Sequence, residues 1–162
     1  MGLMLALSEF CQWCDGTWIA EAIRSSRVAF PIIENFHLFA LTMLLGSAVA
    51  LSLRQFNLIL TDQSVAEVAV HLKPWNRWGL VVMLISGALL FLSEAMKCYG
   101  NTSFRVKMIF LFFALVFQFT VYNRLVASQQ KYRPAFEKMA AAITLFLWFG
   151  VGLAGRAIGF LG

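Results

Sequence analysis

The chain has 162 residues, of which 60% are hydrophobic and only 13% are charged, and its formal net charge is +5. A soluble domain is typically about 45–50% apolar and about 25% charged. This composition excludes a soluble globular domain, a disordered chain and a disulfide-rich secreted module, because too few charged residues are present to cover a water-facing surface. It predicts an all-α integral membrane protein in a lipid bilayer. The positive charge is typical of loops that orient such a protein, and no nucleic-acid partner is predicted.

The first 28 residues predict an amphipathic helix that lies in the membrane interface. They mix Trp, Phe and Ile with Glu, Asp and Arg, and tryptophan favours the depth of the lipid headgroups. Gly16 is a point at which this helix is expected to break in two. We therefore divide the chain into an N-terminal interfacial segment, 1–28, and a four-helix transmembrane domain, 29–162.

Four charge-free apolar stretches predict a bundle of four transmembrane helices. A helix needs about 20 residues to cross about 30 Å of hydrocarbon, so each stretch must extend through a charged residue at one end. The predicted spans lie near 30–53, 78–96, 106–125 and 138–161. Residues 62–72 are expected to form a separate short amphipathic helix, with Pro74 beginning the second span.

The loops predict the orientation of the protein. The two loops 54–77 and 124–138 fall on one side of the membrane, and the termini fall on the other. These loops hold seven basic residues: Arg54, Lys73, Arg77, Arg124, Lys131, Arg133 and Lys138. Basic loops stay in the cytoplasm, so we predict a multi-pass protein of the bacterial inner (cytoplasmic) membrane with both termini in the periplasm.

The polar residues within the spans all lie toward the end of the bundle that holds the termini. Charges inside a bilayer are costly unless they are paired or face a wet cavity, so we expect these side chains to turn inward and meet. Candidates for buried ion pairs are Glu34, Glu94 and Arg156. The full predicted cluster is Glu34, His37, Glu94, Arg105, Lys107 and Arg156.

Other interpretations of this cluster remain open at the level of sequence. Lys107 and Arg105 have stems long enough to reach the headgroups, which would leave them without a functional role. Glu34 and Arg156 could form one static ion pair, and His37 could bond a neighbouring carbonyl. The functional interpretations are a haem or porphyrin site, a quinone site, and a proton or ion path.

His37 is the candidate ligand of a haem iron, because it is the only histidine within a span and imidazole is a common iron ligand. His71 lies in the loop at the other end, roughly 20 Å away along the helix, so the two cannot ligate one iron. Lys107 lies at the depth of His37 and is the candidate for the other face. Arg105 and Arg156 are candidates for binding the haem propionates.

Three cysteines are present, and two of them, Cys11 and Cys14, form a C-x-x-C motif. The residue after Cys14 is Asp15, which excludes the C-x-x-C-H motif of covalent haem attachment. Three interpretations are open. Both thiols could pack on one apolar helix face, they could form a disulfide, or they could belong to a metal site that includes Cys98.

Several short motifs occur along the spans: Phe30-Pro31-x-x-Glu34-x-x-His37-Leu38, Gly46-Ser47, Leu51-x-Leu53-Arg54, Trp78-Gly79, Ser86-Gly87-x-Leu89-Leu90, Phe104-Arg105-x-Lys107-Met108 and Gly155-Arg156-x-Ile158. They resemble the CopD-like superfamily of four-helix membrane proteins, which includes the copper-resistance protein CopD and the membrane haem-binding protoporphyrinogen oxidase. The resemblance covers about residues 17–160, and the whole pattern is most similar to an uncharacterised bacterial branch. It implies haem b as cofactor, with His37 and Lys107 at functionally important positions. Arg105 stands where the oxidase branch has a histidine, and the Met- and His-rich stretches typical of copper transport are missing.

Three functions follow from these interpretations. The first is a redox protein that holds haem b or a porphyrin at the polar cluster and transfers electrons. The second is an accessory or structural subunit without its own cofactor, which packs against other membrane subunits or against copies of itself. The third is a small transporter. No catalytic residue is predicted.

Overall fold

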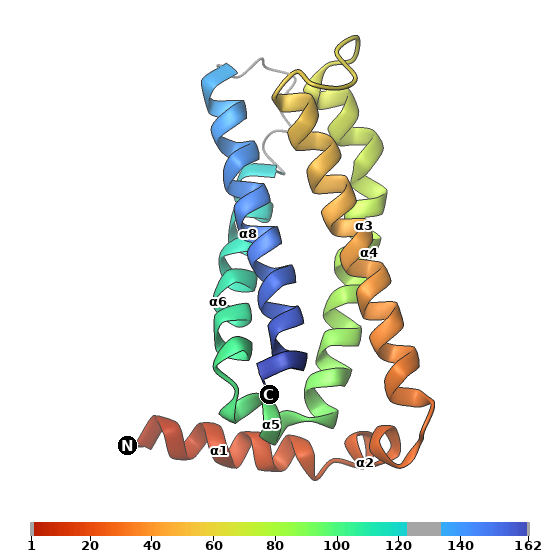
Figure 1. Ribbon diagram of the computed structural model, residues 1–162, viewed down its shortest axis with the longest axis vertical. Coiled ribbons are helices and arrows are strands. Elements are labelled where there is room, and N and C mark those ends of the chain that lie inside the picture. Colours follow the sequence, from red (N-terminus) through yellow and green to blue (C-terminus); the bar gives the residue numbers. More distant parts are fainter. Residues whose placement is uncertain (1, 123–133, 162) are drawn as a thin grey trace.

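The computed structural model describes residues 2–122 and 134–161, and within this part of the chain it contains helices and no strands. Four long helices stand side by side and form the bundle, while two short helices lie across one end of it (Figure 1). The elements are α1 (Gly2–Asp15), α2 (Trp18–Ser25), α3 (Ala29–Gln55), α4 (Val65–Ser93), α5 (Ala95–Gly100), α6 (Thr102–Phe117), a π-helical turn η1 (Gln118–Tyr122) and α8 (Pro134–Leu161).

The predicted class is confirmed in its main feature, since four of these helices are long and apolar enough to cross a membrane. The first, third and fourth correspond to the predicted spans 30–53, 106–125 and 138–161, although residues 123–125 lie outside the described part. The division into segments 1–28 and 29–162 stays a prediction.

The second span begins much earlier than predicted. Ser64 caps α4 through a reciprocal pair of hydrogen bonds: the Ser64 N–H donates to Glu67 Oε2 (2.6 Å), and the Glu67 N–H donates to Ser64 Oγ (3.2 Å). This capping box begins the helix, and Pro74 lies inside it. The expectation of a separate helix at 62–72, with Pro74 starting the span, was therefore wrong. One proline removes a single backbone donor, which a 29-residue helix tolerates.

The core of the bundle lies where α3 packs against α4 and α8, and where α6 packs against α8. Its largest fully buried side chains are Trp148, Leu44 and Val151. Gly79 allows α3 and α4 to approach closely, because a Cβ atom there would lie only 3.2 Å from the Ala40 carbonyl oxygen and from Leu44. The two helices are thus held together by packing of small residues rather than by charge.

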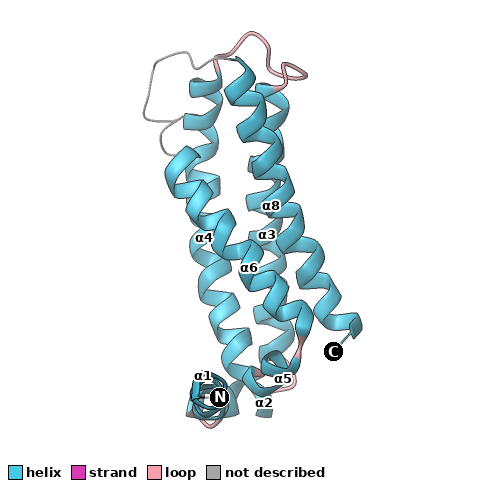
Figure 2. Cartoon of the chain, turned by 90° about the vertical axis from the view of Figure 1, so that its left-hand side faces the viewer, coloured by secondary structure: helices cyan, strands magenta, loops and turns pink. Residues whose placement is uncertain are grey.

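The N-terminal helices α1 and α2 lie across the end of the bundle, and Figure 2 shows α1 nearly end-on while the long helices stand upright. The helix breaks at Gly16, as expected, and Thr17 caps α2 by accepting a hydrogen bond from the Ala20 N–H (3.3 Å). The exposed fractions of Trp13 and Trp18 are 68% and 78%. Such exposed tryptophans on helices that lie across the bundle suit a membrane surface.

α1 and the end of α8 lie at the same end of the bundle (Figure 1), which agrees with the expected order of the spans. The loop between α3 and α4 lies at the opposite end. Arg54 braces this loop by donating to the Gln63 carbonyl oxygen (2.6 Å) and to Asn57 Oδ1 (2.7 Å). The predicted loop residues Arg124, Lys131 and Arg133 lie outside the described residues.

Candidate functional site

His37 lies on α3 and faces α4, where its Nδ1 is 3.0 Å from Ser86 Oγ. Ser86 Oγ donates its own hydrogen to the Val82 carbonyl oxygen at 2.6 Å. When that hydrogen goes to Val82, Ser86 Oγ accepts from His37, and the tautomer that matches this arrangement carries the ring proton on Nδ1. The other ring nitrogen, Nε2, then keeps its lone pair. A neutral imidazole with a fixed tautomer and a free Nε2 is the state in which histidine binds a metal.

The imidazole of His37 rests directly on the backbone of α4. A Cβ atom at Gly87 would lie 3.1 Å from His37 Cε1, which is tighter than ordinary van der Waals contact. Gly87 therefore makes room for the ring, and the Ser86 hydroxyl next to it orients the ring. Both residues thus support His37.

Lys107 lies on α6 and rests against α8 in the same way. A Cβ atom at Gly155 would lie 3.5 Å from both Cε and Nζ of Lys107. No carboxylate of the described residues forms an ion pair with it. His37 thus packs on α4 and Lys107 packs on α8, each against a glycine of the neighbouring helix.

The predicted acids do not join this pair. Glu34 is exposed, although it is only three residues before His37. It lies only about 8 Å along α3 from Ala29, the first residue of this helix, and is therefore close to the end of the bundle. Glu94 is on the short break between α4 and α5, where it accepts an ion-pair contact from Lys97 at 2.6 Å. Glu34 is thus not buried as expected, whereas Glu94 is half-buried and pairs with Lys97 of α5 rather than with a residue of another span.

The two arginines of the predicted cluster also lie at its margin. Arg105 is exposed, donates to the Tyr99 carbonyl oxygen (3.1 Å) and lies 5.9 Å from the centre of the Tyr99 ring. Arg156 on α8 is exposed as well, so it is not buried as predicted. Of the six residues predicted to meet, Glu34, Arg105 and Arg156 are exposed, whereas His37, Glu94 and Lys107 are half-buried.

The cysteines lie where α1 rests on α4 and α5. Cys11 and Cys14 are buried against Ala95, and all three cysteines are free thiols. The packing interpretation is confirmed, and the disulfide interpretation was wrong. Burial raises the pKa of Cys14 and of Cys98 above the ordinary value, and the nearby Glu94 carboxylate raises that of Cys98 further. A raised pKa keeps a thiol protonated and unreactive. Within the described residues, no three potential metal ligands gather at one point.

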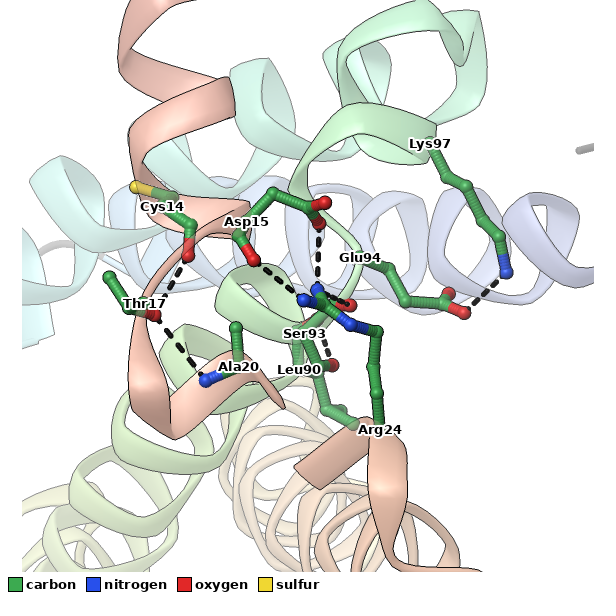
Figure 3. Close-up of polar contacts among 9 residues, drawn as sticks. All are labelled: Cys14, Asp15, Thr17, Ala20, Arg24, Leu90, Ser93, Glu94 and Lys97. Carbon is green, nitrogen blue, oxygen red and sulfur yellow. Dashed lines mark hydrogen bonds and ion pairs between the residues drawn. The ribbon is translucent and has the colours of Figure 1, made fainter. Parts of the chain in front are cut away.

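Arg24 of α2 ties the N-terminal helices to the bundle (Figure 3). Its guanidinium donates to Asp15 Oδ1 (2.9 Å), to the Asp15 carbonyl oxygen (2.6 Å) and to the Ser93 carbonyl oxygen (3.1 Å). Asp15 and Ser93 are the last residues of α1 and α4. A cation at two helix C-termini satisfies carbonyls that lack partners within the helices and interacts favourably with both helix dipoles.

We expect Arg24→Ala to loosen α1 and α2 without unfolding the bundle. The ion pair is partly exposed, so its loss should cost about 1 kcal/mol. That corresponds to roughly fivefold faster protease cleavage near Gly16 when cleavage follows local opening. Limited proteolysis in lipid nanodiscs measures this rate. Arg27→Ala is the matched control, because Arg27 is exposed and makes none of these contacts. Equal cleavage of the two variants would show that Arg24 does not hold the segment.

A second polar group lies at the other end of the bundle, and sequence reasoning missed it. Gln118 Nε2 donates to Asn76 Oδ1 (2.8 Å), and Asn76 Nδ2 donates to Ser47 Oγ (3.3 Å). Gln55 and Ser52 lie beside this chain, and all five side chains are buried. The sequence does contain a signal for this group, namely amide side chains near or within apolar spans. Burial of an amide side chain there costs free energy unless the amide finds polar partners.

No curated protein and no solved structure shows significant similarity to the chain. The resemblance to the CopD-like superfamily therefore stays a prediction. One family model matches almost the whole chain, from the N-terminal helix α1 to the end of α8, and it includes His37 and Lys107. Since this match covers residues 10–161, the chain belongs to DUF6644, a family of unknown function.

Proposed function

We propose that this chain is a multi-pass protein of the bacterial inner membrane that binds haem b through His37 and takes part in electron transfer. One observation carries the proposal: the hydrogen bond between His37 Nδ1 and Ser86 Oγ, which leaves the Nε2 lone pair for iron. This is the arrangement in which metal-binding histidines are usually held, with the second ring nitrogen donating to a fixed acceptor.

Lys107 supports the same proposal through its charge. An ammonium group inside a span, without a carboxylate partner among the described residues, favours an anionic ligand. Haem carries two propionates, which match this requirement. Ligation of iron by Lys107 would first require loss of its proton, whereas pairing with a propionate would not. We therefore assign Lys107 to a propionate and His37 to the iron, and these donor atoms fit the chemistry of the group.

The residues of the chain would hold the group and keep water away from it. When bound, haem supplies one-electron chemistry at its iron. Ser86 fixes the tautomer and direction of the His37 imidazole, and Gly87 gives the ring its place on α4. The apolar core around Leu44 and Trp148 separates this end of the bundle from the polar group at the other end.

A visible spectrum tests this proposal. The full-length chain, expressed with ample haem and purified in mild detergent, should show a Soret band and contain about one haem per chain. Purified protein that remains colourless, although a known haem protein from the same membranes retains its cofactor, would overturn the proposal.

A second candidate function is that of an accessory subunit or homo-oligomer without a cofactor. The observation that favours it is the uneven burial of the spans. In the central windows of α3 and α4, 33% of residues are buried, against 11% for Thr102–Val121 and 17% for Ala135–Ile158. The faces of α6 and α8 are thus free for lipid or for partner helices. Native mass spectrometry after gentle extraction distinguishes the two, because a subunit would appear in a larger assembly.

The proposed orientation makes a direct prediction. The end of the bundle with the basic α3–α4 loop should face the cytoplasm, because basic loops are retained there. Alkaline phosphatase fused after the last residue should then be active, because that enzyme works only in the periplasm. Green fluorescent protein at the same position should be dark. The opposite pattern, with bright fluorescence and no phosphatase activity, would reverse the orientation but keep the number of spans.

A further inference from the structure

A small cavity lies inside the bundle at the end away from α1, and every span contributes a polar side chain to it. Its volume is about 10 Å³, measured as the space open to the centre of a water molecule. The polar side chains come from α3, α4, η1 and α8 in turn. The lining residues are Ala48, Leu51, Ser52, Gln55, Asn76, Gln118, Val121 and Thr144.

Gln55 is the lining residue whose hydrogen bonds are not accounted for. Its side chain is only 5% exposed, yet its amide makes no hydrogen bond with any described residue. Among the described residues, no fully enclosed side-chain nitrogen or oxygen lacks a partner. The amide atoms of Gln55 therefore keep some accessible surface, and Gln55 is one of the residues that line the cavity. A buried amide without a partner is unfavourable, so this geometry calls for a polar occupant.

The neighbours of Gln55 leave further sites open toward the same space. Gln118 uses its Nε2 to donate to Asn76 Oδ1, and its own amide oxygen is not part of that bond. Thr144 Oγ1 donates to the Ala140 carbonyl oxygen at 2.8 Å and keeps its lone pairs. The cavity thus offers both donors and acceptors, as a water molecule with two to four hydrogen bonds requires.

We infer that this cavity binds one water molecule, which joins Gln55 to the hydrogen-bonded chain of Gln118, Asn76 and Ser47. The volume is about the smallest that holds one water, so a larger organic ligand does not fit. The lining contains no carboxylate, so a cation would remain uncompensated in an apolar interior. A neutral water satisfies the amides without adding charge.

The cavity lies where the third span changes its helical form. The π-helical turn η1 begins at Gln118, directly after α6, and such turns are frequent at functional sites. Gln118 is bonded to Asn76 and lines the cavity, so the water would tie the end of the third span to α3.

A structure of the full-length chain in nanodiscs, at a resolution that shows ordered waters, tests the inference directly. We expect one isolated density within about 3 Å of both the Gln55 and Gln118 amides. An empty cavity, a direct bond from Gln55 to protein, or a larger ligand would overturn it. Greater thermal stability in Na⁺ or K⁺ than in choline at equal ionic strength would indicate a cation and would overturn it too.

A double-mutant cycle provides an independent test. Each single variant, Gln55→Leu or Gln118→Leu, changes the unfolding equilibrium constant by some factor. If one water bridges the two amides, the factor for the double variant should differ at least about twofold from the product of the two single factors. The control pair is Gln55→Leu with Gln63→Leu, since Gln63 is exposed in the α3–α4 loop. For this pair, the factor for the double variant should equal the product of the two single factors. Independent effects in both pairs would contradict a shared water. If Gln118→Leu does not fold, the density in the wild-type structure decides.

Discussion

His37→Ala is expected to abolish haem binding, whereas His71→Ala should leave the haem content and the visible spectrum unchanged. His37 would supply the iron ligand, and alanine has no atom that could replace Nε2. His71 is the matched control, because it is the other histidine of the chain and lies exposed on α4, with its Nδ1 2.8 Å from the Glu67 carbonyl oxygen. Haem content per chain and the height of the Soret band measure the effect.

Ser86→Ala extends this experiment to the residue that orients the ring. Loss of such a supporting hydrogen bond typically weakens metal binding about 10–100-fold, so this variant should bind haem weakly rather than not at all. The order wild type, Ser86→Ala, His37→Ala is therefore the expected order of affinity. If His37→Ala binds haem as the wild type does, His37 is not the ligand.

Trp148→Ala is expected to destabilise the bundle strongly, because Trp148 is the largest fully buried side chain among the described residues. It is 1% exposed and belongs to the main core cluster, to which α3, α4, α6 and α8 all contribute. In a bilayer the loss comes from missing contacts and from the cavity left behind, because lipid removes most of the hydrophobic driving force between helices. Large-to-small changes of this kind cost about 3–5 kcal/mol. Unfolding by heat or by denaturing detergent measures the loss.

Phe149→Ala is the control for this prediction. Phe149 is the next residue on α8, is also aromatic, and is 49% exposed on the outer face of the bundle. Its loss should change stability by less than about 1 kcal/mol, as is usual for exposed positions. Equal losses for the two variants would mean that α8 does not turn Trp148 toward the core.

The sequence was a reliable guide wherever a single helix decides the outcome. The breaks at Gly16 and between the spans follow from local chain properties, and so does the presence of four apolar helices. The sequence pattern predicts too late a start for α4, because Pro74 has the features of a helix boundary. A proline marks a boundary only when no stronger signal competes, and the Ser64–Glu67 capping box, ten residues earlier, is such a signal.

The sequence also placed His37 and Lys107 at one depth and at one end of the bundle. It could not assign the side chains to interior or exterior, because that depends on how each helix is rotated against its neighbours. Glu34 and His37 are only three residues apart, yet one is exposed and the other packs against Gly87. Residues at this spacing lie about 60° apart around the axis, which is enough to separate an inner from an outer position.

By itself, the sequence determined that this chain forms apolar helices, how many there are, and which end holds the termini. These properties depend on composition, on the length of each span and on the order of the spans. The tertiary structure alone decided that His37 meets Ser86, that Arg24 joins the ends of α1 and α4, and that Gln55, Asn76 and Gln118 line one small cavity. Each of these contacts joins residues that are distant in the chain, and their approach depends on the packing of whole helices, which no local pattern specifies.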